Sequence, residues 1–136
     1  MIEYYKSYNS KEFSKELKRA VYEVGLKPSI EKTQFCVDKI CELYGISTPS
    51  ILLCKSKDFE GMYIGVRKEI VLNENIELIY LLHELRHHIQ KETLSFFELS
   101  YEDKEHEARM WSSSLFYAVF PEEYLELVRL NKIKYV

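Results

Sequence analysis

The stretch LLHELRHHIQ, residues 81–90, holds three of the four histidines of the chain and contains the pattern H-E-x-x-H. Apolar residues recur at helical spacing from Asn75 to Thr93, which predicts that the stretch lies within a helix. On a helix, His83 and His87 lie about 40° apart on one face, one turn above the other. Their imidazole rings are therefore expected to meet beside the helix.

This spacing suits a metal ion. Two imidazoles one turn apart can bind the same Zn²⁺, each at about 2.0–2.1 Å. Glu84 is rotated by about 100° from His83, so its carboxylate can reach a water on the metal without being a ligand itself. The sequence thus predicts a catalytic zinc site. His83 and His87 are the expected ligands, and Glu84 is the expected general base, which takes a proton from the water and passes it to the leaving amine.

Two histidines do not complete such a site, because a catalytic zinc usually has three protein ligands and one open position. Gln90 and Thr93 stand where an H-E-x-x-H-x-x-G-x-x-H extension requires glycine and histidine, which excludes the third-histidine class. The next cluster of possible ligands is YEDKEHEARMW, residues 101–111. Spacing alone does not choose among its members, which are Glu102, Asp103, Glu105, His106 and Glu107.

Periodicity and capping residues around this centre predict an α+β fold. Two N-terminal helices come first, and three short strands follow them. The helix with H-E-x-x-H is then joined by a connector to two further helices. Asn9 with Glu12 and Ser29 are the expected helix starts, and Gly25 and Gly45 the expected ends. The expected segments are helices 10–24 and 30–44, strands 49–55, 61–65 and 69–73 with a hairpin between the last two, helix 75–93, connector 94–100, helix 101–119 and a helix opened by Pro121.

Composition narrows the class of protein. A length of 136 residues suits one domain over 1–136, and 46% apolar with 30% charged residues is typical of a soluble globular chain. The net charge is −3 with Lys and Arg spread along the chain, so nucleic acid is not a favoured partner. We expect no signal peptide and no membrane span. Three cysteines without a C-x-x-C pair, with Cys36 and Cys41 expected as buried thiols, favour a reducing, cytoplasmic compartment.

HELRH (83–87) followed by EHEARMWSSSLF (105–116) resembles the zinc metallopeptidases of the ImmA/IrrE type, over residues 46–121. That family pairs H-E-x-x-H with a downstream helix of the form E-x-x-A-(N/D)-x-F-A. The resemblance implies a small zincin-like domain with Glu105 as the third zinc ligand. Glu107 is the reserve, because it lies at a gluzincin-like separation from His87. Arg109 departs from the family pattern, since it replaces the Asn or Asp that would buttress a ligand histidine.

The function implied by this resemblance is a zinc-dependent metalloendopeptidase that hydrolyses a protein substrate, such as a transcriptional repressor or another regulatory protein. One alternative is a catalytically inactive, zinc-containing protein-binding module of phage or mobile-element type. Another is a metal-free helical interaction domain. His88 is expected to face solvent, because it lies about 140° round the helix from His83. The donor that would stabilise an oxyanion is left open among Tyr63, Tyr80, Tyr101, His88 and His106.

Overall fold

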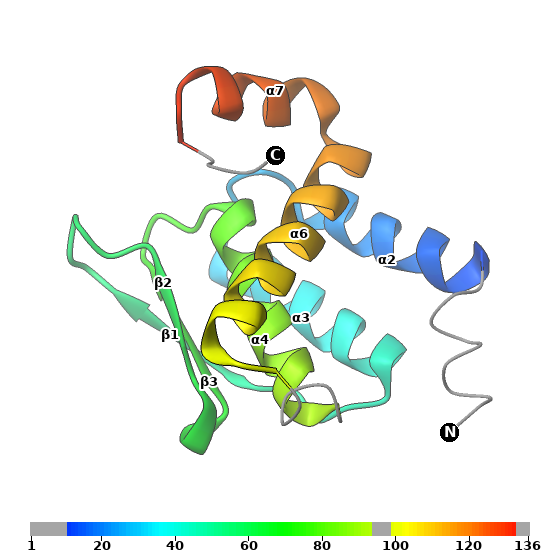
Figure 1. The fold of residues 1–136 in the computed structure, drawn as a ribbon, viewed down its shortest axis with the longest axis vertical. Coiled ribbons are helices and arrows are strands. Elements are labelled where there is room, and N and C mark those ends of the chain that lie inside the picture. Colours follow the sequence, from blue (N-terminus) through cyan, green and yellow to red (C-terminus); the bar gives the residue numbers. More distant parts are fainter. Residues whose placement is uncertain (1–10, 94–98, 133–136) are drawn as a thin grey trace.

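The structure is a computed structural model and describes residues 11–93 and 99–132. It confirms the α+β class (Figure 1): in this part of the chain, two N-terminal helices are followed by a three-stranded mixed sheet and then by three helices. The elements are α2 (Lys11–Val24), α3 (Ile30–Tyr44), β1 (Ser50–Cys54), β2 (Gly61–Ile64), a 3₁₀ turn η1 (Gly65–Arg67), β3 (Glu69–Asn73), α4 (Leu78–Glu92), α6 (Tyr101–Val119) and α7 (Pro121–Arg129).

The helix α3 begins and ends where its capping residues predict. The Ser29 hydroxyl accepts a hydrogen bond from the Lys32 amide at 3.2 Å, and Gly45 takes a left-handed conformation with φ 69° just past the last turn. Gly25 ends α2 in the same way with φ 78°. The expected Asn9 cap lies outside the described residues. Both helices bury their apolar stripes against each other and the rest of the core.

The sheet has the strand order β1-β3-β2. β2 and β3 form the predicted antiparallel hairpin, with Tyr63 opposite Ile70, whereas β1 runs parallel to β3, with Ile51 opposite Ile70. Along β3, Ile70 and Leu72 are buried while Glu69, Val71 and Asn73, which alternate with them, are only half-buried. This alternation places one face of the sheet against α4.

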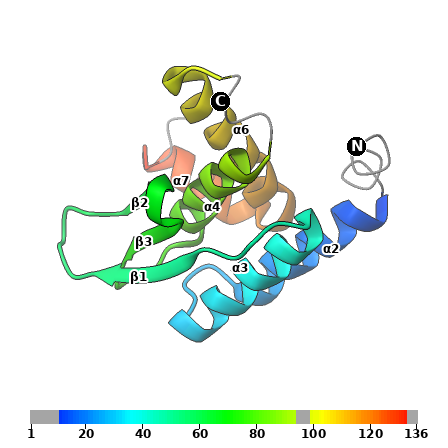
Figure 2. The ribbon, with the colours of Figure 1, turned by 90° about the horizontal axis from the view of Figure 1, so that it is seen from below.

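The helix α4 lies in the middle of the molecule (Figures 1 and 2). It packs on β2 and β3 on one side and on α3 and α6 on others, so residues around most of its circumference are buried. It starts three residues later than predicted, because the side chain of Asn73 holds the preceding residues in a turn. The Asn73 amide donates to the Ser56 and Phe59 carbonyls at 2.6 and 2.7 Å, and its oxygen accepts from the Asn75 amide at 2.9 Å.

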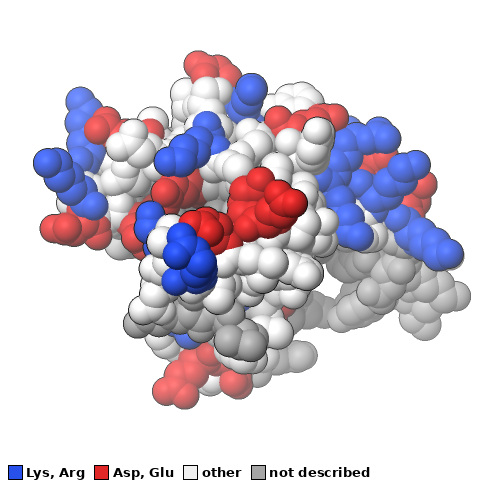
Figure 3. Space-filling model, turned by 90° about the horizontal axis from the view of Figure 1, so that it is seen from above, with Lys and Arg blue, Asp and Glu red and all other residues white. Residues whose placement is uncertain are grey.

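The last two helices complete the fold. Ser100 caps α6 by accepting from the Asp103 amide at 3.2 Å, and Pro121 opens α7 as predicted. The face that carries α7 shows acidic and basic side chains interspersed (Figure 3), and α7 has acidic residues in its first turn and Arg129 in its last, which suits the helix dipole. Within the described ranges, no helix is long and apolar enough to cross a membrane.

Candidate metal centre

α4 and α6 bring three of the sequence-predicted side chains together. The Nε2 atoms of His83 and His87 lie 3.2 Å apart. Glu105, from the first part of α6, reaches both rings: its Oε1 lies 3.4 Å from His83 Nε2 and its Oε2 lies 2.5 Å from His87 Nε2. The three side chains are 13–23% exposed, so they form a shielded cluster that is still open to one side.

The chemistry of this cluster fits a divalent metal. Two atoms that each lie 2.0–2.1 Å from a tetrahedral zinc are about 3.3 Å apart, close to two of the three separations found here, 3.2 and 3.4 Å. The third, 2.5 Å between His87 Nε2 and Glu105 Oε2, is that of a direct hydrogen bond and would have to widen around an ion. Imidazole nitrogen and carboxylate oxygen are both ligands that zinc accepts. Burial, and next the neighbouring His87, lower the pKa of His83, which favours the neutral ring that a metal needs. His83, His87 and Glu105 could therefore hold a zinc ion.

Glu84 lies beside this cluster without joining the contacts between its members. Its side chain is 8% exposed, and its carboxylate and the two histidine nitrogens lie within 4.8 Å of one another. Burial, helped by the charge of Glu105, raises the pKa of Glu84 to about 8. The backbone of β2 passes closely here, since a Cβ on Gly61 would lie 3.1 Å from the Cγ of Glu84. A carboxyl group with this pKa can both accept and donate a proton near neutral pH.

A cleft of about 360 Å³ opens in front of the cluster. Its walls are the edge strand β2 with the start of η1, the side of α4 that carries the two histidines, and the first turns of α6. The lining residues are Gly61, Met62, Tyr63, Gly65, His83, Glu84, His87, Tyr101, Lys104 and Glu105. A second hollow of about 180 Å³ adjoins it, where Tyr80 and Arg109 join His83, Glu84 and Glu105. Glu84 and the cluster thus face open space in which a substrate could lie.

The remaining acids of the 101–111 cluster lie elsewhere. Glu107 forms a two-pronged ion pair with Arg86, with Arg86 Nε to Oε1 at 2.9 Å and Nη2 to Oε2 at 3.0 Å. Burial opposes ionisation of Glu107, but the hydrogen bonds and charge of Arg86 hold its pKa below the ordinary value. Glu102, Asp103 and His106 are exposed. The acid that the structure places at both histidines is Glu105.

The expected exposure of His88 is wrong. Its side chain is fully buried, with Nε2 at 2.7 Å from the Ser47 carbonyl and Nδ1 at 2.8 Å from the Tyr63 hydroxyl. The physical reason is that α4 is packed on both sides, so the face turned away from His83 meets the sheet instead of solvent. Because the Ser47 carbonyl can only accept, Nε2 of His88 donates to it, and a neutral His88 accepts the Tyr63 proton at Nδ1.

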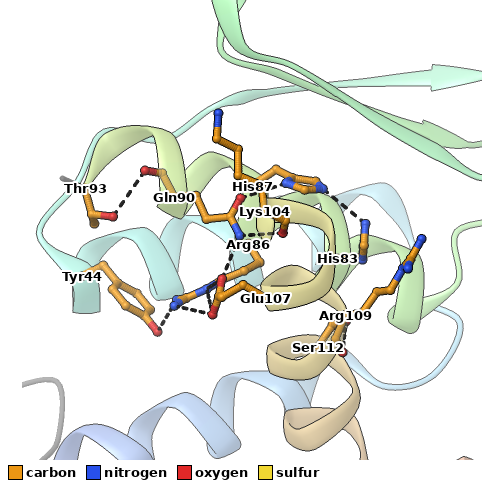
Figure 4. A network of polar contacts seen from close by, with 10 residues as sticks. All are labelled: Tyr44, His83, Arg86, His87, Gln90, Thr93, Lys104, Glu107, Arg109 and Ser112. Atoms are coloured by element: carbon orange, nitrogen blue, oxygen red, sulfur yellow. Dashed lines mark hydrogen bonds and ion pairs between the residues drawn. The ribbon is translucent and has the colours of Figure 1, made fainter. Parts of the chain in front are cut away.

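Gln90 is a site residue that the sequence reasoning missed. Its side chain is 1% exposed, and its Oε1 lies 3.0 Å from Nδ1 of His87 (Figure 4). The sequence held one sign of this contact, because Gln90 follows His87 by three residues and residues three apart on a helix are neighbours. Arg109 lies next to His83 in the same view but offers no acceptor, because a guanidinium only donates.

Comparisons with family models, with curated protein sequences and with solved structures give no match. The resemblance to ImmA/IrrE-type metallopeptidases therefore stays an expectation from the motifs HELRH (83–87) and EHEARMW (105–111). What the structure adds independently is a His83–Glu84–His87 group that could bind a metal ion.

Proposed function

We propose that this protein is a zinc-dependent metalloendopeptidase of the ImmA/IrrE type that hydrolyses a protein substrate. The observation that carries the proposal is the arrival of Glu105, from a separate helix, at both histidines of H-E-x-x-H, with the buried Glu84 alongside. A purely structural zinc site would close its fourth position and would need no general base. The open cleft and the retained Glu84 support catalysis over a structural role.

A bound zinc ion would polarise the scissile carbonyl and make a water molecule at the site more acidic. His83, His87 and Glu105 would hold the ion. The substrate would then lie in the cleft, onto which these three side chains open. Glu84 would take a proton from the attacking water and later deliver it to the leaving amine nitrogen. Its raised pKa suits this double duty, because the protonated form must persist long enough to act as an acid.

The shape of the cleft supports an extended polypeptide as substrate. β2 forms one edge of the sheet within the described residues, and its residues line the cleft directly in front of Glu84. A sheet edge offers unpaired amide and carbonyl groups that can pair with an extended peptide. By the resemblance, such a substrate would be a transcriptional repressor or another regulatory protein.

The test is Glu84→Gln in full-length, zinc-loaded protein, with cleavage of quenched-fluorescent peptide pools as the assay. The variant should keep its zinc and lose about 10²–10⁴-fold in rate, which is the usual contribution of a general acid–base group. Glu74→Gln, at an exposed position, is the matched control and should retain the wild-type rate. Zinc bound without any cleavage by the wild type would favour the inactive binding module, and equal rates in both variants would exclude Glu84 as the base.

A further inference from the structure

The side chain of Gln90 has its amide orientation dictated by two neighbours on α6. Its Nε2 lies 2.9 Å from the Lys104 carbonyl oxygen and 2.7 Å from Glu107 Oε1. Both partners can only accept, so the nitrogen of the amide must point to them. Its Oε1 is thereby turned to His87, at 3.0 Å from Nδ1. The flipped amide would place its oxygen against these two acceptors, so only this orientation of the amide satisfies all three contacts.

This arrangement decides where His87 carries its proton. Since Gln90 Oε1 is an acceptor, Nδ1 of His87 must bear the hydrogen. In the neutral ring, Nε2 is then left with a free lone pair, and Nε2 is the atom that faces His83 and Glu105. The tautomer imposed by Gln90 is therefore the one in which Nε2 can bind a metal.

Glu107 is fixed in turn by groups outside the cluster. Arg86 holds both of its oxygens, and the same guanidinium donates to the Tyr44 hydroxyl at 3.3 Å and lies 5.1 Å from the centre of the Trp111 ring. The chain of contacts runs from His87 through Gln90 and Glu107 to Arg86 (Figure 4), and so joins α4 to α6 and α3. Glu107 is occupied by this role and points away from the two histidines.

We propose that Gln90 is a positioning residue, which holds His87 with its proton on Nδ1 and its Nε2 turned to the metal centre. The inference rests on the proposed metal site, and it assigns to Gln90 the buttressing role that the family pattern would place at position 109. Glu107 then serves to orient Gln90 and is not a ligand. Partners of this kind change metal affinity by about 10–100-fold when they are removed.

The experiment compares two variants at position 90 in the full-length chain. Gln90→Met has a similar size but neither donor nor acceptor. Gln90→Glu combined with Glu107→Gln keeps an acceptor for Nδ1 of His87 and supplies a donor at position 107, whereas Gln90→Glu alone would place two carboxylates about 2.7 Å apart. Gln34→Met is the matched control, because Gln34 is a half-buried glutamine of α3 whose amide donates to Asp38 at 2.8 Å and which belongs to neither the cluster nor its hydrogen-bond network. Zinc affinity is measured by competition with a chromophoric chelator. The tautomer of His87 is read from long-range ¹H–¹⁵N spectra of metal-free protein at alkaline pH, where imidazoles are neutral.

We expect Gln90→Met to weaken zinc binding about 10–100-fold and to lose the Nδ1–H form of His87. The double variant Gln90→Glu/Glu107→Gln should keep that form and stay closer to wild type. Gln34→Met should match the wild type in both measurements. Wild-type zinc affinity in Gln90→Met, or the same loss in both position-90 variants, would overturn the inference. If circular dichroism shows that Gln90→Met is unfolded, the spectrum of the double variant Gln90→Glu/Glu107→Gln decides by keeping or losing the Nδ1–H form. If the wild type binds no zinc, the proposed function is rejected. The hydrogen bond between Gln90 and His87 is still tested in that case, because the tautomer of His87 is measured in metal-free protein.

Discussion

At the scale of single residues, the properties of Glu84 come from its surroundings. The carboxyl is buried between α4 and the edge strand, and this burial raises its pKa to about 8. Gly61 allows the backbone of β2 to approach it, since any larger residue would place a Cβ 3.1 Å from Glu84 Cγ. The sequence identified Glu84 from the motif, but the need for glycine at 61 depends on a contact between segments twenty-three residues apart.

Gly61→Ala should therefore lower the rate of peptide cleavage while leaving zinc content unchanged. The added methyl group must push Glu84 by a few tenths of an ångström, and misplacing a catalytic group by about 1 Å costs about 100-fold, so we expect a loss of about 10-fold. Gly65→Ala is the control, because its Cβ would meet Lys91 Cδ at an ordinary 3.5 Å. A wild-type rate in Gly61→Ala would show that the close approach at Gly61 has no catalytic consequence.

At the scale of the elements, α4 explains what the sequence could and could not predict. Its apolar stripe, with Leu82, Leu85 and Ile89, identified the helix and the face that packs into the core. A stripe indicates only one buried side, whereas α4 also meets the sheet on the side of His88. The parallel pairing of β1 with β3 was likewise not predicted, because it joins strands that are not consecutive in the chain.

The burial of His88 can be tested by His88→Leu. The change leaves the Ser47 carbonyl and the Tyr63 hydroxyl without their buried partner, so we expect a loss of about 1–3 kcal/mol in the free energy of unfolding. His106→Leu, at an exposed histidine, should change it by no more than about 0.5 kcal/mol. Urea denaturation of the metal-free proteins measures both values. A loss in His88→Leu as small as that in His106→Leu would place His88 at the surface after all.

The helix α3 carries a prediction about pH. Burial raises the pKa of Cys36, and burial followed by the charge of Asp38 raises that of Cys41, in both cases from 9.0 to about 12. A pKa raised by folding gives stability that is complete below pH 9 and is lost as the pH rises toward 12. The free energy of unfolding should therefore fall over that interval.

The same burial should make these two thiols inert in the native protein. At about pH 8 a disulfide reagent should modify the half-buried Cys54 alone, and Cys36 and Cys41 only after denaturation. Cys54→Ser should then show no rapid reaction. Fast modification of two or three thiols in the folded wild type would contradict the burial of the α3 cysteines.

At the scale of the whole molecule, the candidate site depends on two segments brought together by the fold. HELRH predicted two ligands and a base from local spacing alone, because residues four apart on a helix share a face. Spacing alone left the third position open among five residues of the 101–111 cluster, and the family resemblance implied Glu105 with Glu107 in reserve. The packing of α6 on α4 brings Glu105 to both histidines. Gln90 and its support from Arg86 and Glu107 follow from the same packing.

The most direct test of the proposed site is the zinc content of tag-free, full-length protein after incubation with the metal and removal of the excess, measured by elemental analysis. The site predicts about one zinc per chain in the wild type and nearly none in Glu105→Ala. Glu102→Ala, at an exposed acid on the same helix, should keep the wild-type content. No zinc in the wild type, or equal zinc in the two variants, would contradict a metal centre formed by His83, His87 and Glu105.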